Sequence, residues 1–277
     1  MGSAVLLLKN TFFCVLNRFT PTAYPFVRYA FKAEFNNPSS SIQDRVAFSA
    51  LEEGFRSQIL RKDDTIVCKG LSKKNLSFLQ LSSLFGLRTL QILPENCPSS
   101  YKSWIEYCGG EIKFIPSSAT EVDYIDRVNR LCKENASFHS ADTLPADQNL
   151  FEEMIDEDKD NRIHPHLIVA PINRDDAIPG RKAFCEKHPD TKVVGVLLEG
   201  QESYLQDTSF LEAVVKVDKD SALKRAKQFL SEEGISVGII SGAILAATVT
   251  LIGEQDFGPS DTEMIFTDKA FNSKFRL

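Results

Sequence analysis

The chain has 277 residues, of which 43% are hydrophobic, and its formal net charge is −6 at pH 7. This length is enough for one large α/β unit or for two lobes. The basic residues are scattered and no apolar run is long enough for a transmembrane helix, which argues against a nucleic-acid-binding surface and a membrane-binding face. The six cysteines include no Cys-x-x-Cys pair, and we interpret them as buried, reduced thiols of an intracellular protein.

The N-terminal segment has an unusual composition. Residues 1–33 contain basic residues but no acid, and they are rich in Leu, Val and Phe. Residues 1–19 therefore have some features of a mitochondrial presequence, although Arg and Ser are sparse for one. We favour an ordinary N-terminal arm, which implies a cytoplasmic location, with a mitochondrial location as the alternative.

Strand-like and helix-like segments alternate along the chain. Short apolar runs bounded by turn residues are typical of strands, and longer periodic segments are typical of helices. Repeated β-α units of this length predict a mostly parallel, doubly wound sheet. In chain order the expected elements are strand 31–35, helix 46–60, strand 65–68, helix 76–85, strand 87–93, helix 99–107, strand 111–115, helix 121–134, strand 167–170, helix 177–187, strand 192–198, strand 213–217, helix 221–233, a small-residue helix around 241–243 and strand 264–266.

Two segments contain residue types that bind metal ions in proteins. Residues 152–160 form a strongly acidic run, but they lack the glycine and the distal glutamate of a calcium loop, so we interpret them as a solvated loop or a frayed helix. His164 and His166 have a spacing that occurs in metal sites, but no cysteine is nearby, and we interpret them as a solvent-facing pair. The sequence therefore predicts no metal site.

A specific pattern lies between the first expected strand and the first expected helix. It reads Lys-x-Glu at residues 32–34, Asn-Pro at 37–38, a serine run at 39–41 and Asp-Arg at 44–45. This pattern resembles the cysteine synthase and cystathionine β-synthase family, which belongs to the second fold type of pyridoxal-phosphate enzymes. Residues 232–243 are similar to the family's Glu-Glu-Gly-Ile…Gly-Ile-Ser-Ser-Gly-Ala segment.

The resemblance runs from about residue 20 to the end of the chain, and it implies a fold. That fold is α/β and two-lobed, like the tryptophan synthase β subunit, with mostly parallel, doubly wound sheets. It also implies a homodimer. The larger lobe is expected to comprise residues 1–35 and 140–277, and the smaller lobe residues 36–139.

Three of the positions that the family uses to hold its cofactor and substrate differ here. The residue before Asp-Arg is the Schiff-base lysine in the family and Gln43 in this chain, and a primary amide cannot form an imine. The family's loop that binds the substrate carboxylate corresponds to residues 70–75 here. These residues lack the family's glycine and hydroxyl pattern. The partner of the pyridine nitrogen corresponds to Ile240, which offers no hydrogen bond. Ser241 remains, and we interpret it as a helix cap.

The fourth altered position is the family's glycine-rich phosphate loop, which maps onto residues 170–180. Of the residues in the family's loop, this chain has only the first and the last, Ala170 and Gly180. Asp175 and Asp176 would each repel a phosphate by about 4 kcal/mol per unit charge at ~4 Å on a surface-like dielectric. We predict instead that a helix starts near these acids and that one carboxylate caps it. The degenerate cofactor-binding positions are Asn173, Arg174, Asp175, Asp176, Ala177 and Ile240.

These changes predict a pseudoenzyme that binds no cofactor and has no catalytic residue. The lobes are expected to meet at Gln43, residues 70–75 and residues 173–177. Because cysteine synthases accept the C-terminal peptide of serine acetyltransferase in their active site, the resemblance implies that the old cleft binds a protein C-terminal peptide or a small anion. The candidate cleft residues are Gln43, Ser72, Lys73, Lys74, Asn75, Arg174 and Ser241.

Two alternatives stay open. The first is a pyridoxal-phosphate-dependent enzyme that performs β-replacement on serine or O-acetylserine in cysteine biosynthesis. Such an enzyme would use another lysine, for example Lys73 or Lys74, in place of the missing Schiff-base lysine. The second alternative is a decayed paralogue without a selected function.

Overall fold

The computed structural model describes residues 8, 11–19, 27–147, 149–156, 165–173, 176, 179–254 and 260–269. Contacts within the chain divide it into two units. Ala4–Ile42 and Gln148–Arg276 form the large unit, and Gln43–Asp147 form the small unit. The sequence places these boundaries somewhat earlier, after residues 35 and 139.

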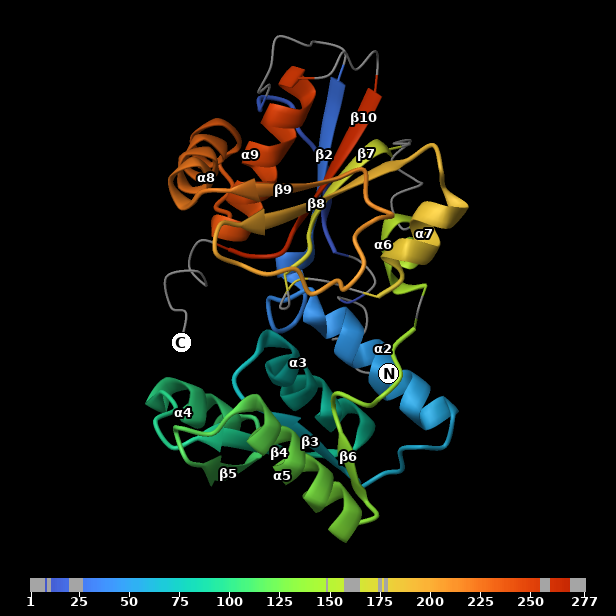
Figure 1. Ribbon diagram of the computed structural model, residues 1–277, viewed down its shortest axis with the longest axis vertical. Helices are drawn as coiled ribbons and strands as arrows, with labels where there is room; N and C mark the ends of the chain where they lie inside the picture. The colour runs from blue at the N-terminus through green and yellow to red at the C-terminus, as the bar shows by residue number, and fades with distance from the viewer. Residues whose placement is uncertain are drawn as a thin grey trace. The chain divides into compact units, whose positions relative to one another are not determined.

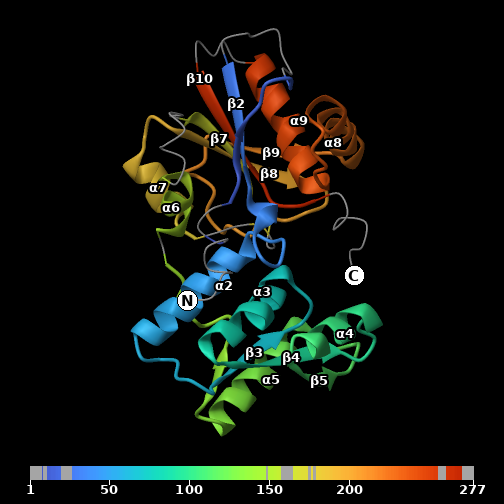
Figure 2. The same ribbon diagram turned by 180° about the vertical axis from the view of Figure 1, so that it is seen from behind.

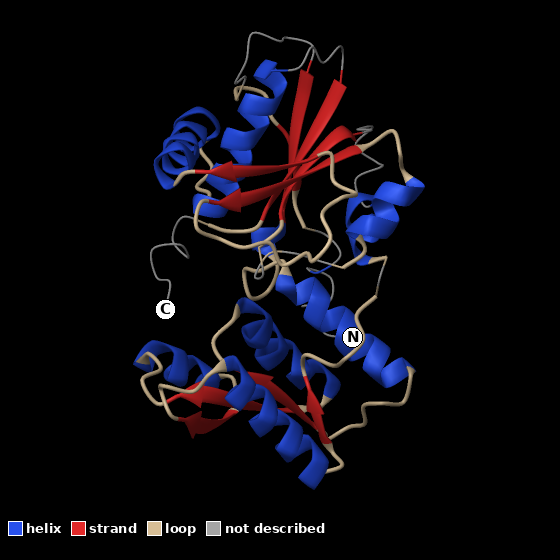
Figure 3. Cartoon of the chain, viewed as in Figure 1, coloured by secondary structure: helices blue, strands red, loops and turns tan. Residues whose placement is uncertain are grey.

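The small unit is a layered α/β structure (Figure 3). Its elements are α2 (Gln43–Arg56), β3 (Thr65–Lys69), α3 (Lys73–Ser82), the 3-10 turn η2 (Ser83–Phe85), β4 (Arg88–Pro94), α4 (Ser99–Tyr107), β5 (Glu111–Ile115), α5 (Glu121–Glu134) and β6 (Phe138–Ser140). The four strands form a fully parallel sheet in the order β5-β4-β3-β6. Helices α3 and α4 pack on one face through Leu79 and Ile105, and α5 packs on the other through Val128 and Leu131. Helix α2 packs against α3.

The large unit is built on a second sheet. Its elements are β1 (Phe13–Val15), β2 (Val27–Ala33), the 3-10 turn η1 (Glu34–Asn36), α6 (Leu150–Asp156), β7 (Pro165–Pro171), α7 (Arg181–Lys187), β8 (Lys192–Leu198), β9 (Ala213–Val217), α8 (Lys219–Glu233), α9 (Ile239–Glu254) and β10 (Ser260–Phe266). The strand order is β1-β2-β10-β7-β8-β9, and only β1 runs antiparallel to its neighbour. Helices α8 and α9 lie on one side of this sheet, and α6 and α7 lie on the other (Figures 1 and 2). The fold is therefore α/β with mostly parallel sheets, as predicted.

Aromatic side chains and small residues build the core on the α8 and α9 side. Phe229 of α8 is fully buried, and its ring centroid lies 5.4, 5.7 and 5.5 Å from those of Phe19, Phe31 and Phe266. Helix α9 packs closely against α8, because a Cβ atom at Gly242 would lie only 2.3 Å from the carbonyl oxygen of Ala222. The small residues of α9 thus permit a helix contact that larger side chains would prevent.

Most of the expected elements are present, and five have the predicted bounds: α4, β5, α5, β8 and β9. The expected helix 46–60 begins earlier, at Gln43, and ends at Arg56, because Gln58 adopts a left-handed φ of 60° that stops the helix. Strands β1 and β6 were not predicted, since three residues are too few to show a period.

The predicted start of the helix after β7 is wrong. Helix α7 begins at Arg181, and its N-cap is Gly180, with a φ of 91° and no side-chain hydrogen bond. Gly180 has a left-handed backbone that the interior of a helix does not adopt, so the helix can begin only after it. Asp176 lies in a turn, where its N–H donates to the carbonyl of Asn173 at 3.3 Å. Asp176 is therefore not a helix cap, and Asp175 lies outside the described residues.

Segment 13–19 belongs to the large unit. Strand β1 pairs with β2, and the Glu233 carboxylate accepts hydrogen bonds from the backbone N–H groups of Arg18 and Phe19 at 2.8 and 2.6 Å. Phe19 is 1% exposed. Among the described residues, no helix combines the length and the apolar character that crossing a membrane requires.

The six cysteines are free thiols, but only two are buried. Cys68 and Cys97 are buried as expected, and burial raises the pKa of Cys68 to about 12. The prediction of burial is wrong for the other four, which are half-buried: Cys14, Cys108, Cys132 and Cys185.

Candidate functional site

The loop between β3 and α3 contains four of the candidate residues. Ser72 is the N-cap of α3, and its hydroxyl accepts a hydrogen bond from the N–H of Asn75 at 3.2 Å. The Asn75 side chain donates to the carbonyls of Lys69 and Gly70 at 2.7 and 3.0 Å. Both polar side chains therefore hold the loop itself, and the first turn of α3 is capped from within the chain.

The lysines near this loop face Asp142, a residue that the sequence analysis did not single out. Lys74 Nζ lies 3.1 Å from one oxygen of the Asp142 carboxylate, and Lys69 Nζ lies 3.4 Å from the other. Lys69 also pairs with Glu121. Partial burial acts to raise the pKa of Asp142, but the two ammonium groups outweigh it and hold that pKa below its usual value. Lys74 is thus an ion-paired residue.

This arrangement predicts a pH-dependent contribution to stability. Because the pKa of Asp142 is lowered in the folded protein, its contribution is present above the unfolded value of about 4 and is lost as the pH falls through the folded pKa. Urea unfolding at pH 7 should show a lower midpoint for Asp142→Asn than for the unmodified protein. The difference between the two midpoints should shrink as the pH falls below about 4. A difference that stays constant on acidification would show that the Asp142 charge is not its source.

Gln43 is the first residue of α2 and is 3% exposed. The two residues after it, Asp44 and Arg45, are also buried. Helix α2 packs against α3, so Gln43 and the loop that follows β3 belong to the same unit.

The segment after β7 contains a buried guanidinium group. Arg181 is 1% exposed, and within the described part of the chain its Nε, Nη1 and Nη2 atoms have no hydrogen-bond partner. The group lies 5.3 Å from the ring centroid of Phe151. Burial lowers the pKa of Arg181 to about 10, although the charges of Cys185 and Asp176 act in the opposite direction. The sequence analysis missed Arg181, whose only signal is its place directly after Gly180, the last residue of the segment that resembles the family's phosphate loop.

The other predicted residues of this segment are placed only in part. Asn173 is buried and donates through Nδ2 to the Gln201 side chain at 3.4 Å. Arg174, Asp175 and Ala177 lie outside the described residues.

The N-terminus of α9 is closed by a carboxylate from the segment after β10. The backbone N–H groups of Ile240 and Ser241 donate to Asp268 at 3.1 and 2.9 Å, and the Ser241 hydroxyl donates to the same carboxylate at 2.7 Å. A Cβ atom at Gly238 would lie 2.1 Å from Asp268 Oδ2. The capping side chain is therefore Asp268, not Ser241 as expected. Glycine is required at position 238 because the carboxylate fills the space beside it.

The structure thus assigns the candidate residues to different units. Gln43, Ser72, Lys73, Lys74 and Asn75 belong to the small unit, whereas Asn173, Asp176, Ile240 and Ser241 belong to the large unit. The expected meeting of these segments stays a prediction.

The histidines offer no metal site. His166 is exposed, and its Nδ1 accepts a hydrogen bond from the N–H of Asp261 at 3.4 Å. His164 lies outside the described residues. In the ranges that the structure describes, no three His, Cys, Asp or Glu side chains form a group that could hold a metal ion.

Known proteins resemble this chain in sequence and in structure. No family model matches it. The chain is 23% identical over 245 residues to the cysteine synthase of Staphylococcus aureus, covering 79% of this chain and 78% of that protein. Its fold matches the cysteine synthase of Entamoeba histolytica with a TM-score of 0.83 at 18% identity, covering 99% and 89% of the two chains. It matches the cystathionine β-synthase of Bacillus anthracis with a TM-score of 0.77 at 21% identity, covering 96% and 97%. The chain is therefore similar in sequence to cysteine synthases over about four fifths of its length, and it shares the fold of the cysteine synthase and cystathionine β-synthase structures.

Proposed function

We propose that the protein is a catalytically inactive, cysteine synthase-like protein that binds a ligand without pyridoxal phosphate. The observation that carries this proposal is Gln43, which stands where the family resemblance expects the Schiff-base lysine. An amide nitrogen is not nucleophilic enough to form an imine with an aldehyde. Gln43 is also buried, so that a lysine there would need a partner for its charge.

The N-terminus of α9 supports the same proposal. In the family this helix end carries the serine expected to face the pyridine nitrogen. Here Ile240 is an alkyl residue, and the Ser241 hydroxyl already donates to Asp268. The same carboxylate accepts hydrogen bonds from the backbone N–H groups of Ile240 and Ser241. The polar groups of this helix end are used within the chain, so they do not fit a role toward a cofactor ring.

We propose that the ligand is a protein C-terminal carboxylate or another small anion. The support is the positive charge of Lys73 and Lys74 at the start of α3, because positive charge next to a helix N-terminus favours anions. An anion there would compete with Asp142 for Lys74. By analogy with the family, we also propose a homodimer and a cytoplasmic location, with a mitochondrial location as the alternative.

The second candidate function is pyridoxal-phosphate-dependent β-replacement on serine or O-acetylserine. The relatives favour it, because those that match most of the chain are named cysteine synthases. The buried guanidinium of Arg181 favours it as well, since it could neutralise a phosphate group near residues 173–176. The cofactor, when bound, supplies an electron sink for carbanion chemistry. Arg181 would be the residue that holds its phosphate.

A titration with pyridoxal phosphate separates the two candidates. We expect no saturable, stoichiometric aldimine absorption band, and no cysteine formation from O-acetylserine and sulfide. A catalytically active cysteine synthase from S. aureus serves as the positive control. Saturable aldimine formation together with turnover would establish the second candidate and refute the first.

Gln43→Lys alone is expected to restore neither cofactor binding nor cysteine synthesis. The new amine would lack a phosphate cradle, because Asp176 stands where a glycine amide is expected. It would also lack a partner for the ring nitrogen, because Ile240 offers none. Losing one such electrostatic contact typically costs about 3–4 kcal/mol, and several losses together exceed what one imine recovers.

The measurement is absorbance during titration of Gln43→Lys with pyridoxal phosphate, followed by the O-acetylserine and sulfide assay. Gln43→Met is the matched control, since it has a similar size and no amine. If Gln43→Lys formed a stoichiometric aldimine with turnover and Gln43→Met did not, only the lysine would be missing. The proposed degeneracy of the other positions would then be wrong.

A further inference from the structure

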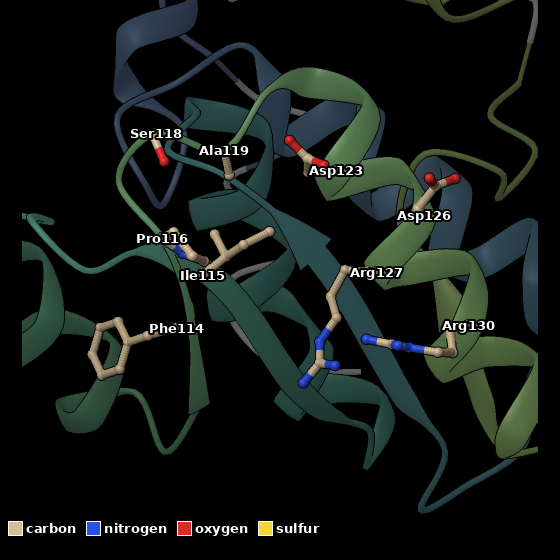
Figure 4. Close-up of a pocket in the computed structure, with 9 residues that line it drawn as sticks. All are labelled: Phe114, Ile115, Pro116, Ser118, Ala119, Asp123, Asp126, Arg127 and Arg130. Atoms are coloured by element: carbon tan, nitrogen blue, oxygen red, sulfur yellow. The ribbon is translucent and has the colours of Figure 1, made fainter.

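The small unit contains a cavity that none of the cofactor-related positions lines. It has a volume of about 650 Å³, within the range of small-molecule sites. It lies between strand β5, the loop that follows it and helix α5 (Figure 4). Its lining combines four apolar residues and two arginines with two acids: Phe114, Ile115, Pro116, Ala119, Arg127, Arg130, Asp123 and Asp126.

Two arginines give the cavity a positive end. Arg127 and Arg130 are one turn apart on α5, and Figure 4 shows their guanidinium groups converging. Each lies four residues after an acid, Asp123 or Asp126, a spacing that commonly produces an ion pair on a helix. Within the described residues neither arginine makes an ion pair or a hydrogen bond. In Figure 4 the two carboxylates point away from the guanidinium groups.

One of these acids is already used elsewhere. The Asp123 carboxylate accepts hydrogen bonds from the N–H and the hydroxyl of Thr120, both at 2.7 Å, and so forms the capping box of α5. These bonds hold the pKa of Asp123 below its usual value, so the carboxylate stays ionised at the helix end. This carboxylate therefore serves the helix cap, and within the described part of the chain it makes no ion pair with Arg127. Two converging guanidinium groups without a counter-ion favour the binding of an external anion.

The number and geometry of the donors indicate which anion fits. One carboxylate matches the fork of a single guanidinium group, whereas a phosphate monoester has three terminal oxygens and nearly two negative charges. The wall opposite the arginines is apolar. Ile115 points from β5 toward α5 in Figure 4, and Pro116 and Ala119 continue this wall along the loop. Phe114 lies at the edge of the cavity and is 48% exposed.

We propose that this cavity binds a small phosphate monoester, with the phosphate on Arg127 and Arg130 and an apolar organic group on Ile115 and Pro116. The site does not depend on the proposed function, because it lies within the small unit and shares no residue with the positions that would hold pyridoxal phosphate.

Calorimetric titration with three probes tests the ligand class. Phenyl phosphate should bind with one site per chain. Inorganic phosphate should bind about fivefold more weakly, because it cannot cover the apolar wall. Benzoate should bind about tenfold more weakly than phenyl phosphate, because it satisfies one guanidinium group only. Binding should weaken as the salt concentration rises.

Variants test the residues. Arg127→Gln combined with Arg130→Gln should weaken phenyl phosphate binding at least about tenfold, and Arg130→Gln alone should weaken it by a smaller factor. Asp126→Asn should strengthen it about twofold, because a nearby negative charge is removed. Lys133→Gln is the matched control, since Lys133 lies on the same helix outside the cavity and should leave the affinity unchanged. Unfolding midpoints show whether each variant is folded.

Several outcomes would overturn the proposal. Phenyl phosphate could fail to bind at millimolar concentration, or the arginine variants could bind it as tightly as the unmodified protein. Lys133→Gln could lose as much affinity for phenyl phosphate as the arginine variants. Benzoate could bind more tightly than phenyl phosphate. Phenyl phosphate has no aldehyde and forms no aldimine, so each of these outcomes is independent of the pyridoxal phosphate titration.

Discussion

Asp268→Ala is expected to lower the free energy of unfolding by about 3–5 kcal/mol. The Asp268 carboxylate is 5% exposed and accepts hydrogen bonds from the N–H groups of Ile240 and Ser241 and from the Ser241 hydroxyl. Alanine would leave these donors buried without this acceptor, and each unsatisfied donor costs about 1–3 kcal/mol, although the costs do not simply add. The start of α9 would also lose the negative charge that favours a helix N-terminus.

Urea unfolding followed by circular dichroism measures this effect. Asp268→Asn should lose less stability than Asp268→Ala, because its carbonyl oxygen keeps one acceptor. Asp190→Ala is the control, since Asp190 is exposed and should change stability by less than about 0.5 kcal/mol. If Asp268→Ala and Asp190→Ala unfolded at the same urea concentration, the contact at α9 would not stabilise the protein.

Phe229→Ala is expected to cost a similar amount, about 3–5 kcal/mol, for a different reason. The Phe229 ring is fully buried on α8, and it packs edge to face against Phe19, Phe31 and Phe266. Truncation would remove the transfer free energy of the ring and leave a cavity in a core that cannot collapse onto it. The edge-to-face contacts add about 0.5–1.5 kcal/mol each beyond the area that they bury.

Leu230→Ala is the matched control, because Leu230 follows Phe229 on the same helix but is 48% exposed. Leu230→Ala should lower the free energy of unfolding by about 1 kcal/mol or less. Equal losses for the two variants would indicate that helix propensity, and not the aromatic cluster, determines the result. Phe229→Leu should recover part of the lost stability, since it restores volume without restoring the ring contacts.

The fold could be predicted from sequence because its signals are local. Strands such as Lys192–Leu198 are buried on both faces and read as continuous apolar runs, while helices such as Glu121–Glu134 show clear caps and a period. Alternation of the two is enough to predict a parallel α/β sheet. The resemblance at residues 32–45 and 232–243 pointed to the cysteine synthases to which the chain is similar.

The polar contacts of the site could not be predicted in this way. Asp268 and Ser241 are 27 residues apart, and they meet only because β10 ends beside the start of α9. Arg181 becomes unusual only when its burial is known, since an arginine at the start of a helix is ordinarily solvated. The error at Asp176 has a local cause, because the left-handed backbone of Gly180 outweighed the capping preference of the acids.

Strand β1 has a consequence for aggregation. It covers the free edge of β2, a seven-residue strand in which all but one residue are buried, through the pairs Phe13–Lys32, Cys14–Phe31 and Val15–Ala30. A long apolar edge recruits strands from other chains, whereas a three-residue edge offers them few backbone partners. A truncated chain that begins after residue 19 would expose the edge of β2. Such a chain should form intermolecular β-structure even under conditions in which its two sheets remain folded.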